Sequence, residues 1–286
     1  MKADLHLHTH YSDGTDSPDE VVARAARGRF DVIAVTDHDT VNGLPEALDA
    51  GRQLGVKVVP GVEITAQWNQ CELHLLAYFS PKDDGRRGWR NSDLNEQLKL
   101  FMRYRSDRGT RIVERLNALG IALTLEDVRR QAGKGVVGRP HIAAALVARG
   151  RVSGMDQAFN EFLKRGRPAW VDKPRIDARD AIQLVHGAGG VIVLAHPGLI
   201  SDTGIPLQLF AQGLDGLEVY HSRHSPSQSA RFLDLVRQHH RLGTGGSDCH
   251  GMLKGEPLMG RVQFSGEDLD RFLERLKCNG TIGNER

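Results

Sequence analysis

Short apolar runs alternate with helix-forming stretches along most of the chain, and this alternation restricts the folds that the sequence can adopt. Before the middle of the chain, apolar runs typical of buried strands occupy residues 2–7, 31–36, 56–59 and 71–79. The runs return at residues 191–195, 214–220 and 242–246. Strand, helix and strand repeated at this spacing predict parallel strands joined by helical crossovers. The sequence therefore predicts an α/β fold with seven strands.

Helix boundaries are well marked in the first connecting stretch. Ser17 can cap a helix, Pro18 suits its first turn, and Glu20 completes a capping box. Gly28 then ends this helix, and a second helix is expected at about residues 44–54. Later helices are expected at residues 177–186 and 227–239.

The alternation is interrupted between residues 81 and 173, where the sequence predicts helices and no strong strand. Helical stretches or helix starts are expected here at residues 92–119, 124, 140 and 153. Residues 86–175 carry 20 Lys and Arg against 9 Asp and Glu, a net charge of +11, so the rest carries −9 within the total of +2. We expect an inserted, basic helical subdomain at 81–173, set into a barrel formed by 1–80 and 174–286. Such a segment suits an anion such as phosphate or nucleic acid, although solvated helix faces would give the same charge.

The composition argues against several classes of protein. No apolar run approaches the about 20 residues that a membrane span needs, so no membrane partner is expected. The sequence opens without a signal-peptide pattern. The three cysteines, Cys71, Cys249 and Cys278, are scattered and form no CxxC pair. This spacing indicates neither a disulfide framework nor a thiolate zinc site, and we expect a cytoplasmic protein without an obligate protein partner.

Histidine and acidic side chains gather where the predicted strands end. His6 and His8 are two apart, so an extended backbone aims both imidazoles to one side. Asp248 and His250 repeat this spacing after the last strand. The full set of candidate metal ligands is His6, His8, Asp13, His38, Glu63, His74, His196, Asp248 and His250. Because the carboxyl ends of parallel barrel strands converge at one face, we expect these residues to meet there.

Imidazole and carboxylate side chains in such number predict a site for several divalent metal ions. This ligand chemistry suits Mn, Zn, Fe or Co and argues against a metal selected by thiolates. A single histidine at a strand end is usually a satisfied polar residue, so the repetition of the pattern indicates the metal. Cys249 lies between two candidate ligands, and an extended backbone would point its side chain away from them.

Five short motifs resemble, in order, those of the polymerase and histidinol phosphatase (PHP) family. They are Asp4–Thr9, Thr36–His38, Gly61–Glu63, Ala195–Pro197 and Ser247–His250. The resemblance implies a distorted seven-stranded β/α barrel, the PHP fold, with up to three divalent metal ions. The expected metal is manganese. By this resemblance, one ion would take His6, His8, Glu63 and Asp248. A second ion would share Glu63 and take His74 and His196, and a third would take Asp13, His38 and His250.

The inserted segment and the motif Gly138–His141 resemble one branch of this family. That branch contains nucleoside 3',5'-bisphosphate phosphatases and a 5'-to-3' exonuclease that acts on short RNA. The resemblance implies a nucleotide substrate such as 3'-phosphoadenosine 5'-phosphate, hydrolysed to the 5'-mononucleotide and phosphate. Short RNA or DNA oligonucleotides are alternative substrates. A phosphatase of the histidinol-phosphate type and a non-catalytic nucleic-acid-binding module with structural metals also remain open.

Clustered metal ions would permit attack on a phosphate ester by a metal-bridging hydroxide. The ions neutralise the charge of the ester and lower the pKa of the bound water. We expect Glu63, Asp248 and His196 at this catalytic centre. The leaving 3'-oxygen needs a proton, which His221, His224 or a metal-bound water could supply.

The second phosphate of such a substrate needs cationic partners away from the metals. Arg139 and His141 stand at the start of a short predicted helix and are the first candidates, because helix N-termini and Arg both favour phosphate. Lys134 and Arg223 are weaker candidates, and each could equally be a surface charge.

Overall fold

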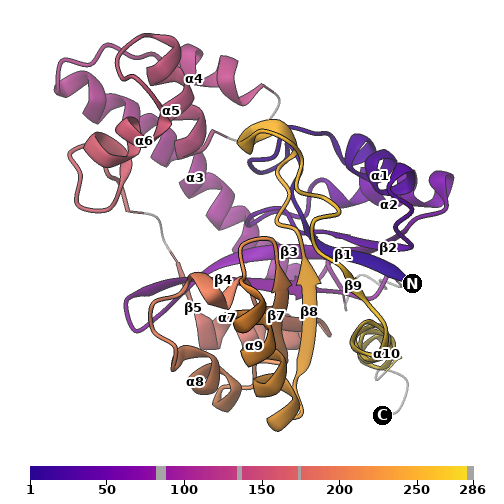
Figure 1. Cartoon of the computed structure of the whole chain (residues 1–286). Helices are drawn as coiled ribbons and strands as arrows, with labels where there is room; N and C mark the ends of the chain where they lie inside the picture. Colours follow the sequence, from indigo (N-terminus) through magenta and orange to yellow (C-terminus); the bar gives the residue numbers. More distant parts are fainter. Residues whose placement is uncertain (82–87, 134–136, 173–174, 282–286) are drawn as a thin grey trace.

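The computed structural model describes residues 1–81, 88–133, 137–172 and 175–281. Within these ranges, a nine-stranded sheet curls into a nearly closed barrel (Figure 1). Its strands are β1 (Lys2–Leu7), β2 (Val32–Val35), β3 (Lys57–Trp68), β4 (Cys71–Tyr78), β5 (Ile176–Asp177), β6 (Val191–Leu194), β7 (Gly216–His221), β8 (Leu242–Gly246) and β9 (Phe264–Ser265). The order along the sheet is β8-β7-β6-β4-β3-β2-β1-β9, and β5 pairs with β3. The predicted α/β barrel is confirmed, with the two-residue strands β5 and β9 added to the seven expected.

Strand β3 is longer than predicted because it continues past residue 59 to Trp68. Asn69 and Gln70 then turn the chain with φ of 46° and 67°, the left-handed geometry of a two-residue hairpin turn. As a result β4 returns antiparallel to β3, with Trp68 opposite Cys71, and it also pairs antiparallel with β6. The prediction of parallel pairing is therefore wrong at β4. An Asn-Gln turn lacks the glycine that usually marks such a hairpin in a sequence.

Strands β1 and β8 meet at the seam of the barrel. The N–H of His8 donates to the carbonyl of Cys249 at 3.0 Å, and the N–H of Asp248 donates to the carbonyl of His6 at 3.0 Å. Glycine is required at position 246, because a Cβ there would lie 2.3 Å from the Cβ of His6. Two segments from opposite ends of the sequence therefore lie side by side.

Helices surround the sheet (Figure 1). Those packed on the barrel are α1 (Pro18–Arg27), α2 (Leu44–Leu54), α7 (Ala178–Gly187), α8 (Ile205–Ala211), α9 (Pro226–Gln238) and α10 (Glu267–Thr281). Single turns of 3-10 helix follow β6 and β8 at Pro197–Leu199 and Gly251–Lys254. The capping box of Ser17 and Glu20 begins α1 as predicted, whereas the sequence analysis does not anticipate α8 and α10.

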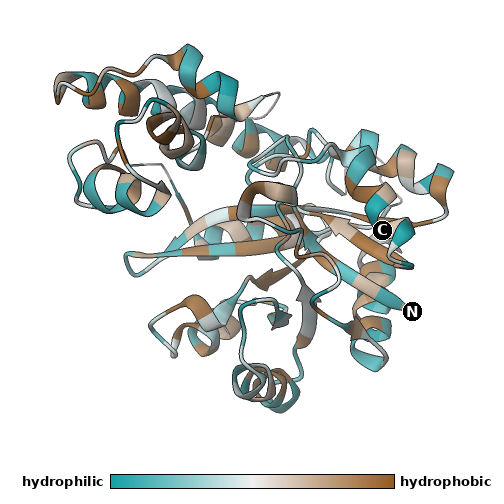
Figure 2. Ribbon diagram, turned by 45° about the horizontal axis from the view of Figure 1, so that its top comes forward, coloured by the Kyte–Doolittle hydropathy of each residue, from teal (hydrophilic) through white to brown (hydrophobic). Residues whose placement is uncertain are grey.

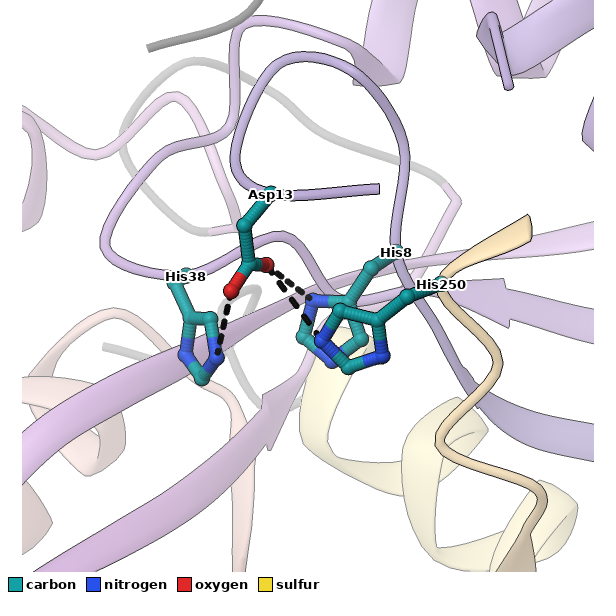
Figure 3. Close-up of side chains that lie close together, drawn as sticks. All are labelled: His8, Asp13, His38 and His250. Carbon is teal, nitrogen blue, oxygen red and sulfur yellow. Dashed lines mark ion pairs between the residues drawn. The ribbon is translucent and has the colours of Figure 1, made fainter. Parts of the chain in front are cut away.

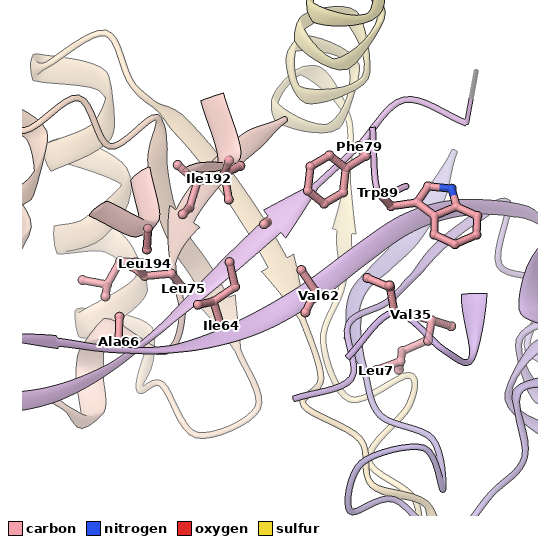
Figure 4. Packing of buried hydrophobic residues seen from close by; sticks show 14 of the residues in the cluster. Leu7, Val35, Val62, Ile64, Ala66, Leu75, Phe79, Trp89, Ile192 and Leu194 are labelled. Carbon is pink, nitrogen blue, oxygen red and sulfur yellow. The ribbon is translucent and has the colours of Figure 1, made fainter. Parts of the chain in front are cut away.

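Buried apolar side chains lie on both faces of the sheet. In the larger cluster, residues such as Val35, Val62 and Ile192 pack in the layer between the strands and the outer helices (Figure 4). In a second cluster, residues including Leu5 and Tyr78 pack with α10. Figure 2 shows the hydrophobic colour along the strands and hydrophilic residues on many outward helix faces. Burial on both faces explains why the strands read as continuous apolar runs.

Between the two barrel portions, the described residues 88–133 and 137–172 form what we call the cap. Its helices are α3 (Ser92–Ala118), α4 (Leu125–Ala132), α5 (Arg139–Ala148), α6 (Met155–Ala158) and the π-helical turn Phe159–Leu163. Leu94 and Leu98 of α3 are buried in the barrel cluster, whereas residues from Ile112 to Val171 form a separate hydrophobic cluster. In Figure 1, α3 leads from the sheet to this outlying group of helices. The domain limits at 81 and 173 remain a prediction.

No helix in the described ranges combines the length and the apolar composition that crossing a membrane requires.

Candidate metal centre

The carboxylate of Glu63 lies at the centre of the predicted ligand cluster. Glu63 is fully buried in β3. The ring nitrogens that lie 3.0 to 3.2 Å from its two oxygens belong to His6, His8, His38, His74 and His196. These histidines come from β1, from the segments after β1, β2 and β6, and from β4. The fold therefore brings five imidazoles from distant parts of the sequence to one acid.

Glu63 reaches this place from the interior of β3, although the sequence analysis expected it just after a strand end. Its backbone N–H donates to the carbonyl of Asp37 at 3.2 Å, and its carbonyl accepts the N–H of Asp39 at 2.9 Å. On its other side β3 pairs with β4, which sets Glu63 opposite Leu76. These bonds fix His38, the residue between the two aspartates, beside the central carboxylate.

The two neighbouring aspartates also hold the loops of the site. Asp37 accepts the N–H of Thr9 at 2.7 Å and the hydroxyl of Ser12 at 2.6 Å. Asp39 accepts the N–H and the hydroxyl of Thr65 at 2.7 and 2.8 Å. Both acids are buried, and their hydrogen bonds compensate for lost hydration. The loop after β1 is thereby ordered by the protein itself.

Asp13 forms a second focus of the cluster (Figure 3). One of its oxygens lies 3.3 Å from His250 Nε2 and 3.9 Å from His8 Nδ1, and the other lies 3.9 Å from His38 Nε2. Figure 3 shows the three rings turned toward the carboxylate from three separate segments.

Asp248 lies on the opposite side of His8. Its Oδ1 is 3.3 Å from His8 Nε2 and 3.5 Å from His6 Nε2. The backbone of Asp248 is in the left-handed region, with φ of 55°, two residues after the glycine-rich end of β8. This non-glycine conformation costs about 1 kcal/mol, as found at many functional sites.

These side chains fit divalent metal ions. Among the described residues, four groups have ligand atoms that all lie within 4.8 Å of one another: His6-His8-Glu63-Asp248, His8-Asp13-His38-His250, His38-Glu63-His74 and His6-Glu218-His221. Ligands bound about 2.0–2.2 Å from one ion lie about 3.0–3.5 Å apart, and most of the separations above fall in that range. The first group has the composition implied by the family resemblance. His38 lies within reach of two groups, whereas the expectation gave it to one.

The electrostatics of the cluster favour ionised carboxylates. Burial alone would raise the pKa of Glu63, Asp13 and Asp248, but the surrounding imidazoles hold all three well below their usual range. Burial would lower the pKa of His8, but its bonds to Asp248 and Glu63 raise it to about 9. The pKa of His38 falls well below 6.5, because burial outweighs the effect of its acidic neighbours. A divalent cation bound here would neutralise these carboxylates.

His221, the last residue of β7, and His224, which follows the strand, have different hydrogen bonds. His221 Nδ1 accepts the N–H of Arg223 at 3.1 Å, so the ring proton is on Nε2. Among the described residues this buried Nε2 has no hydrogen-bond partner, and it lies 3.6 Å from Asp248 Oδ2. Both ring nitrogens of His224 are in use, one donating to a backbone carbonyl and one accepting a backbone N–H. His221 therefore has a proton to offer the site, and His224 has none.

A cavity of about 240 Å³ extends from the cluster to the cap. The candidate ligands that line one end are Asp13, His38 and His74. Arg108 and Arg139 line the other end, with aromatic and aliphatic neighbours Phe101, Tyr104, Ile112, Ile142 and Phe159. The guanidinium carbons of these two arginines lie 5.0 and 4.7 Å from the ring centre of Trp170. The cavity thus joins an acidic end with imidazoles to a basic, aromatic end.

The other predicted substrate contacts are placed differently. His141 is buried, and its Nδ1 accepts the N–H of Gly138 at 3.1 Å, so it caps the start of α5. The side chain of Arg223 is exposed, and its contact with the site is the hydrogen bond from its backbone N–H to His221. Lys134 lies outside the described residues.

Two residues of the site, Glu218 and Arg108, are not among those predicted from the sequence. Glu218 lies 2.9 Å from His6, and the only signal for it is an acid placed between the apolar residues of a strand. Arg108 belongs to a helix with many basic residues, and no pattern distinguishes it from its neighbours. Only the folded chain places it on the cavity.

The chain is similar to known proteins over most of its length. A family model described as PHP domain matches residues 4–115. The 5'-3' exoribonuclease Rnm of Escherichia coli (strain K12) is 33% identical to this chain, over 86% of this chain and 84% of that protein. The 3',5'-nucleoside bisphosphate phosphatase of Chromobacterium violaceum is 31% identical over 91% of both chains.

Solved structures agree with these relatives. A structure from Bifidobacterium adolescentis, described as a metal-dependent phosphoesterase, superposes with a TM-score of 0.82 at 33% identity, covering 99% of this chain and 98% of that one. The chain belongs to the PHP family, and it is a metal-dependent phosphoesterase of that family.

Proposed function

We propose that this protein removes the 3'-phosphate from nucleoside 3',5'-bisphosphates and yields the 5'-mononucleotide and phosphate. The observation that carries the proposal is the two-ended cavity. Ligands for metal ions line one end, and Arg108 and Arg139 with aromatic side chains line the other. A substrate with a reacting phosphate, a base and a second phosphate matches both ends. The printed name of the relative from Chromobacterium violaceum supports this substrate class.

The groups around Glu63, Asp13 and Asp248 would hold up to three divalent ions, with manganese proposed and Zn, Fe or Co as alternatives. Bound there, such ions neutralise the phosphate and lower the pKa of a water molecule toward neutrality. Glu63 would bridge two ions, because its two oxygens face different sets of imidazoles. Asp248 and His196 would complete the ligand sets beside it.

The protonated Nε2 of His221 is the group best placed to assist the leaving 3'-oxygen. It is buried, and the group that it faces is the carboxylate of Asp248, whose Oδ2 lies 3.6 Å away. His224 is set aside for this role because its ring nitrogens hold the backbone at Val219 and Gly198.

A comparison of substrates tests the proposal. With Mn²⁺ present, we expect kcat/KM for a 3',5'-bisphosphonucleotide to exceed that for 5'-phosphorylated oligonucleotides of two to five residues. Histidinol phosphate serves as a phosphomonoester without a base or a second phosphate. A kcat/KM that rises with oligonucleotide length would replace the proposal with the second candidate, a 5'-to-3' exoribonuclease. The basic cap and the relative from Escherichia coli favour that candidate.

Replacing Arg139 with Ala is expected to raise KM for a 3',5'-bisphosphate about 10- to 100-fold. A hydrogen bond to a charged group contributes about 1.5–3 kcal/mol, and each 1.4 kcal/mol is a factor of ten. The KM for a nucleoside 3'-monophosphate should change by less than about threefold, because that substrate lacks the 5'-phosphate.

Arg151→Ala is the matched control for this experiment, since Arg151 is an exposed arginine of the cap. Equal losses of Arg139→Ala on both substrates would refute the contact between Arg139 and the second phosphate.

A further inference from the structure

Glu218 is a buried acid in β7, between the apolar residues Leu217 and Val219. Its exposed fraction is 1%. Burying a carboxylate costs several kcal/mol unless hydrogen bonds and opposite charges compensate. An apolar side chain would fill this strand position without that cost, so the partners of Glu218 indicate its role.

Each oxygen of Glu218 contacts a different candidate metal ligand. Oε1 lies 2.9 Å from His6 Nδ1, and Oε2 accepts the backbone N–H of His196 at 2.7 Å. His6 faces one oxygen of Glu63, and His196 faces the other. The carboxylate of Glu218 therefore contacts two candidate ligands, His6 and His196, that face different oxygens of Glu63.

The contact with His6 decides which of its ring nitrogens can bind a cation. A neutral imidazole carries one N–H, and an acid at 2.9 Å keeps that proton on Nδ1. The lone pair of Nε2 then points toward Glu63 Oε2 at 3.1 Å and Asp248 Oδ1 at 3.5 Å. A histidine ligand whose other nitrogen donates to a carboxylate is oriented for metal and made more basic.

The hydrogen bond from the backbone N–H of His196 to Glu218 holds His196 in an unusual backbone conformation. His196 has φ of 33° and ψ of 54°, in the left-handed region that non-glycine residues seldom adopt. This conformation is strained for a residue with a Cβ, and the hydrogen bond to Glu218 helps to hold it. The bond fixes the direction in which the ring of His196 leaves the end of β6 and reaches Glu63.

We propose that Glu218 is a positioning residue, which selects the tautomer of His6 and anchors the backbone of His196 without binding metal itself. The inference rests on the proposed metal centre. His6, Glu218 and His221 also form a close group, so a fourth ion is the alternative. Both oxygens of Glu218 already accept N–H groups, and His221 presents a proton to the site, so this group suits a cation less well than the others.

The matched control is Asp215, the residue directly before β7, which also accepts a hydrogen bond from Arg275 at 3.2 Å. This buried acid likewise joins an imidazole, His186 at 2.8 Å, to a backbone N–H, that of Ile192 at 2.9 Å. Asp215→Asn therefore introduces the same chemical change as Glu218→Gln at a site without candidate metal ligands. Any effect of a buried amide on folding alone appears in both variants.

The experiment titrates metal-free protein with Mn²⁺ against a chromophoric chelator and then measures bound Mn at saturation. We expect Glu218→Gln to weaken Mn²⁺ binding about 10- to 100-fold, as outer partners of metal ligands usually do. The Mn content at saturation should equal that of the wild type, and Asp215→Asn should bind Mn²⁺ with wild-type affinity. Should Glu218→Gln not fold, Glu218→Asp, which keeps the charge but shortens its reach, carries the same expectation.

Two results would overturn the inference. A wild-type affinity for Mn²⁺ in the Glu218 variants would leave Glu218 a purely structural acid. Loss of one Mn per chain at saturation would make it a ligand. Absence of Mn²⁺ binding in the wild type is a separate outcome, because it would reject the metal centre and, with it, any positioning role.

Discussion

Replacement of Glu63 with Gln is expected to remove bound metal and phosphoesterase activity together. Five imidazoles face the two oxygens of this acid, and an amide offers them one neutral oxygen and an NH₂ group that cannot bind a cation. Metal ions contribute several kcal/mol to phosphoryl transfer, so kcat/KM should fall on the order of 10³-fold or more. Metal analysis of the purified variant and an assay with Mn²⁺ provide the measurement.

Asp215→Asn again serves as the control. It alters a buried carboxylate whose partners, His186, Ile192 and Arg275, are not candidate metal ligands. A Glu63→Gln protein with its full complement of metal would refute the bridging position of Glu63, whatever its activity.

Removal of metal from the wild-type protein is expected to lower its melting temperature by about 5–10 °C and to abolish hydrolysis. Binding to the folded state alone stabilises it by about 2.7 kcal/mol at a ligand concentration 100 times Kd. For large domains each kcal/mol corresponds to about 2–4 °C. The physical cause is the buried acid Glu63 and the partly buried acids Asp13 and Asp248, which a cation would neutralise.

The measurement is thermal unfolding after dialysis against a chelator, and again after Mn²⁺ is returned. Mg²⁺, which prefers oxygen ligands in octahedral geometry, is the control ion and should restore less of the loss. Equal melting temperatures with and without chelator would show that the cluster holds no ion that contributes to folding.

Much of the barrel could be predicted because local sequence determines it. Apolar runs separated by capped helices specify strands and crossovers, and residues two apart, such as His6 and His8, share one side of a strand whatever the surroundings. The loops after parallel strands converge, so the candidate ligands could be expected to lie close together.

The antiparallel β4 could not be predicted in the same way. It depends on positive φ at Asn69 and Gln70, which the residue types alone do not require. Glu218 and Arg108 are defined by partners distant in the sequence, and no spacing rule links Glu218 to His6. The roles of His221 and His224 separate only through backbone hydrogen bonds.

The seam between β1 and β8 has a consequence for biosynthesis. His6 and His8 emerge from the ribosome long before Asp248 and His250, with which they pair at the seam. A nascent chain therefore lacks one side of the pocket until the residues that follow β8 have been made. Prematurely terminated products would carry the early histidines but lack the acid that faces them, and would be inert toward phosphate esters in the cell.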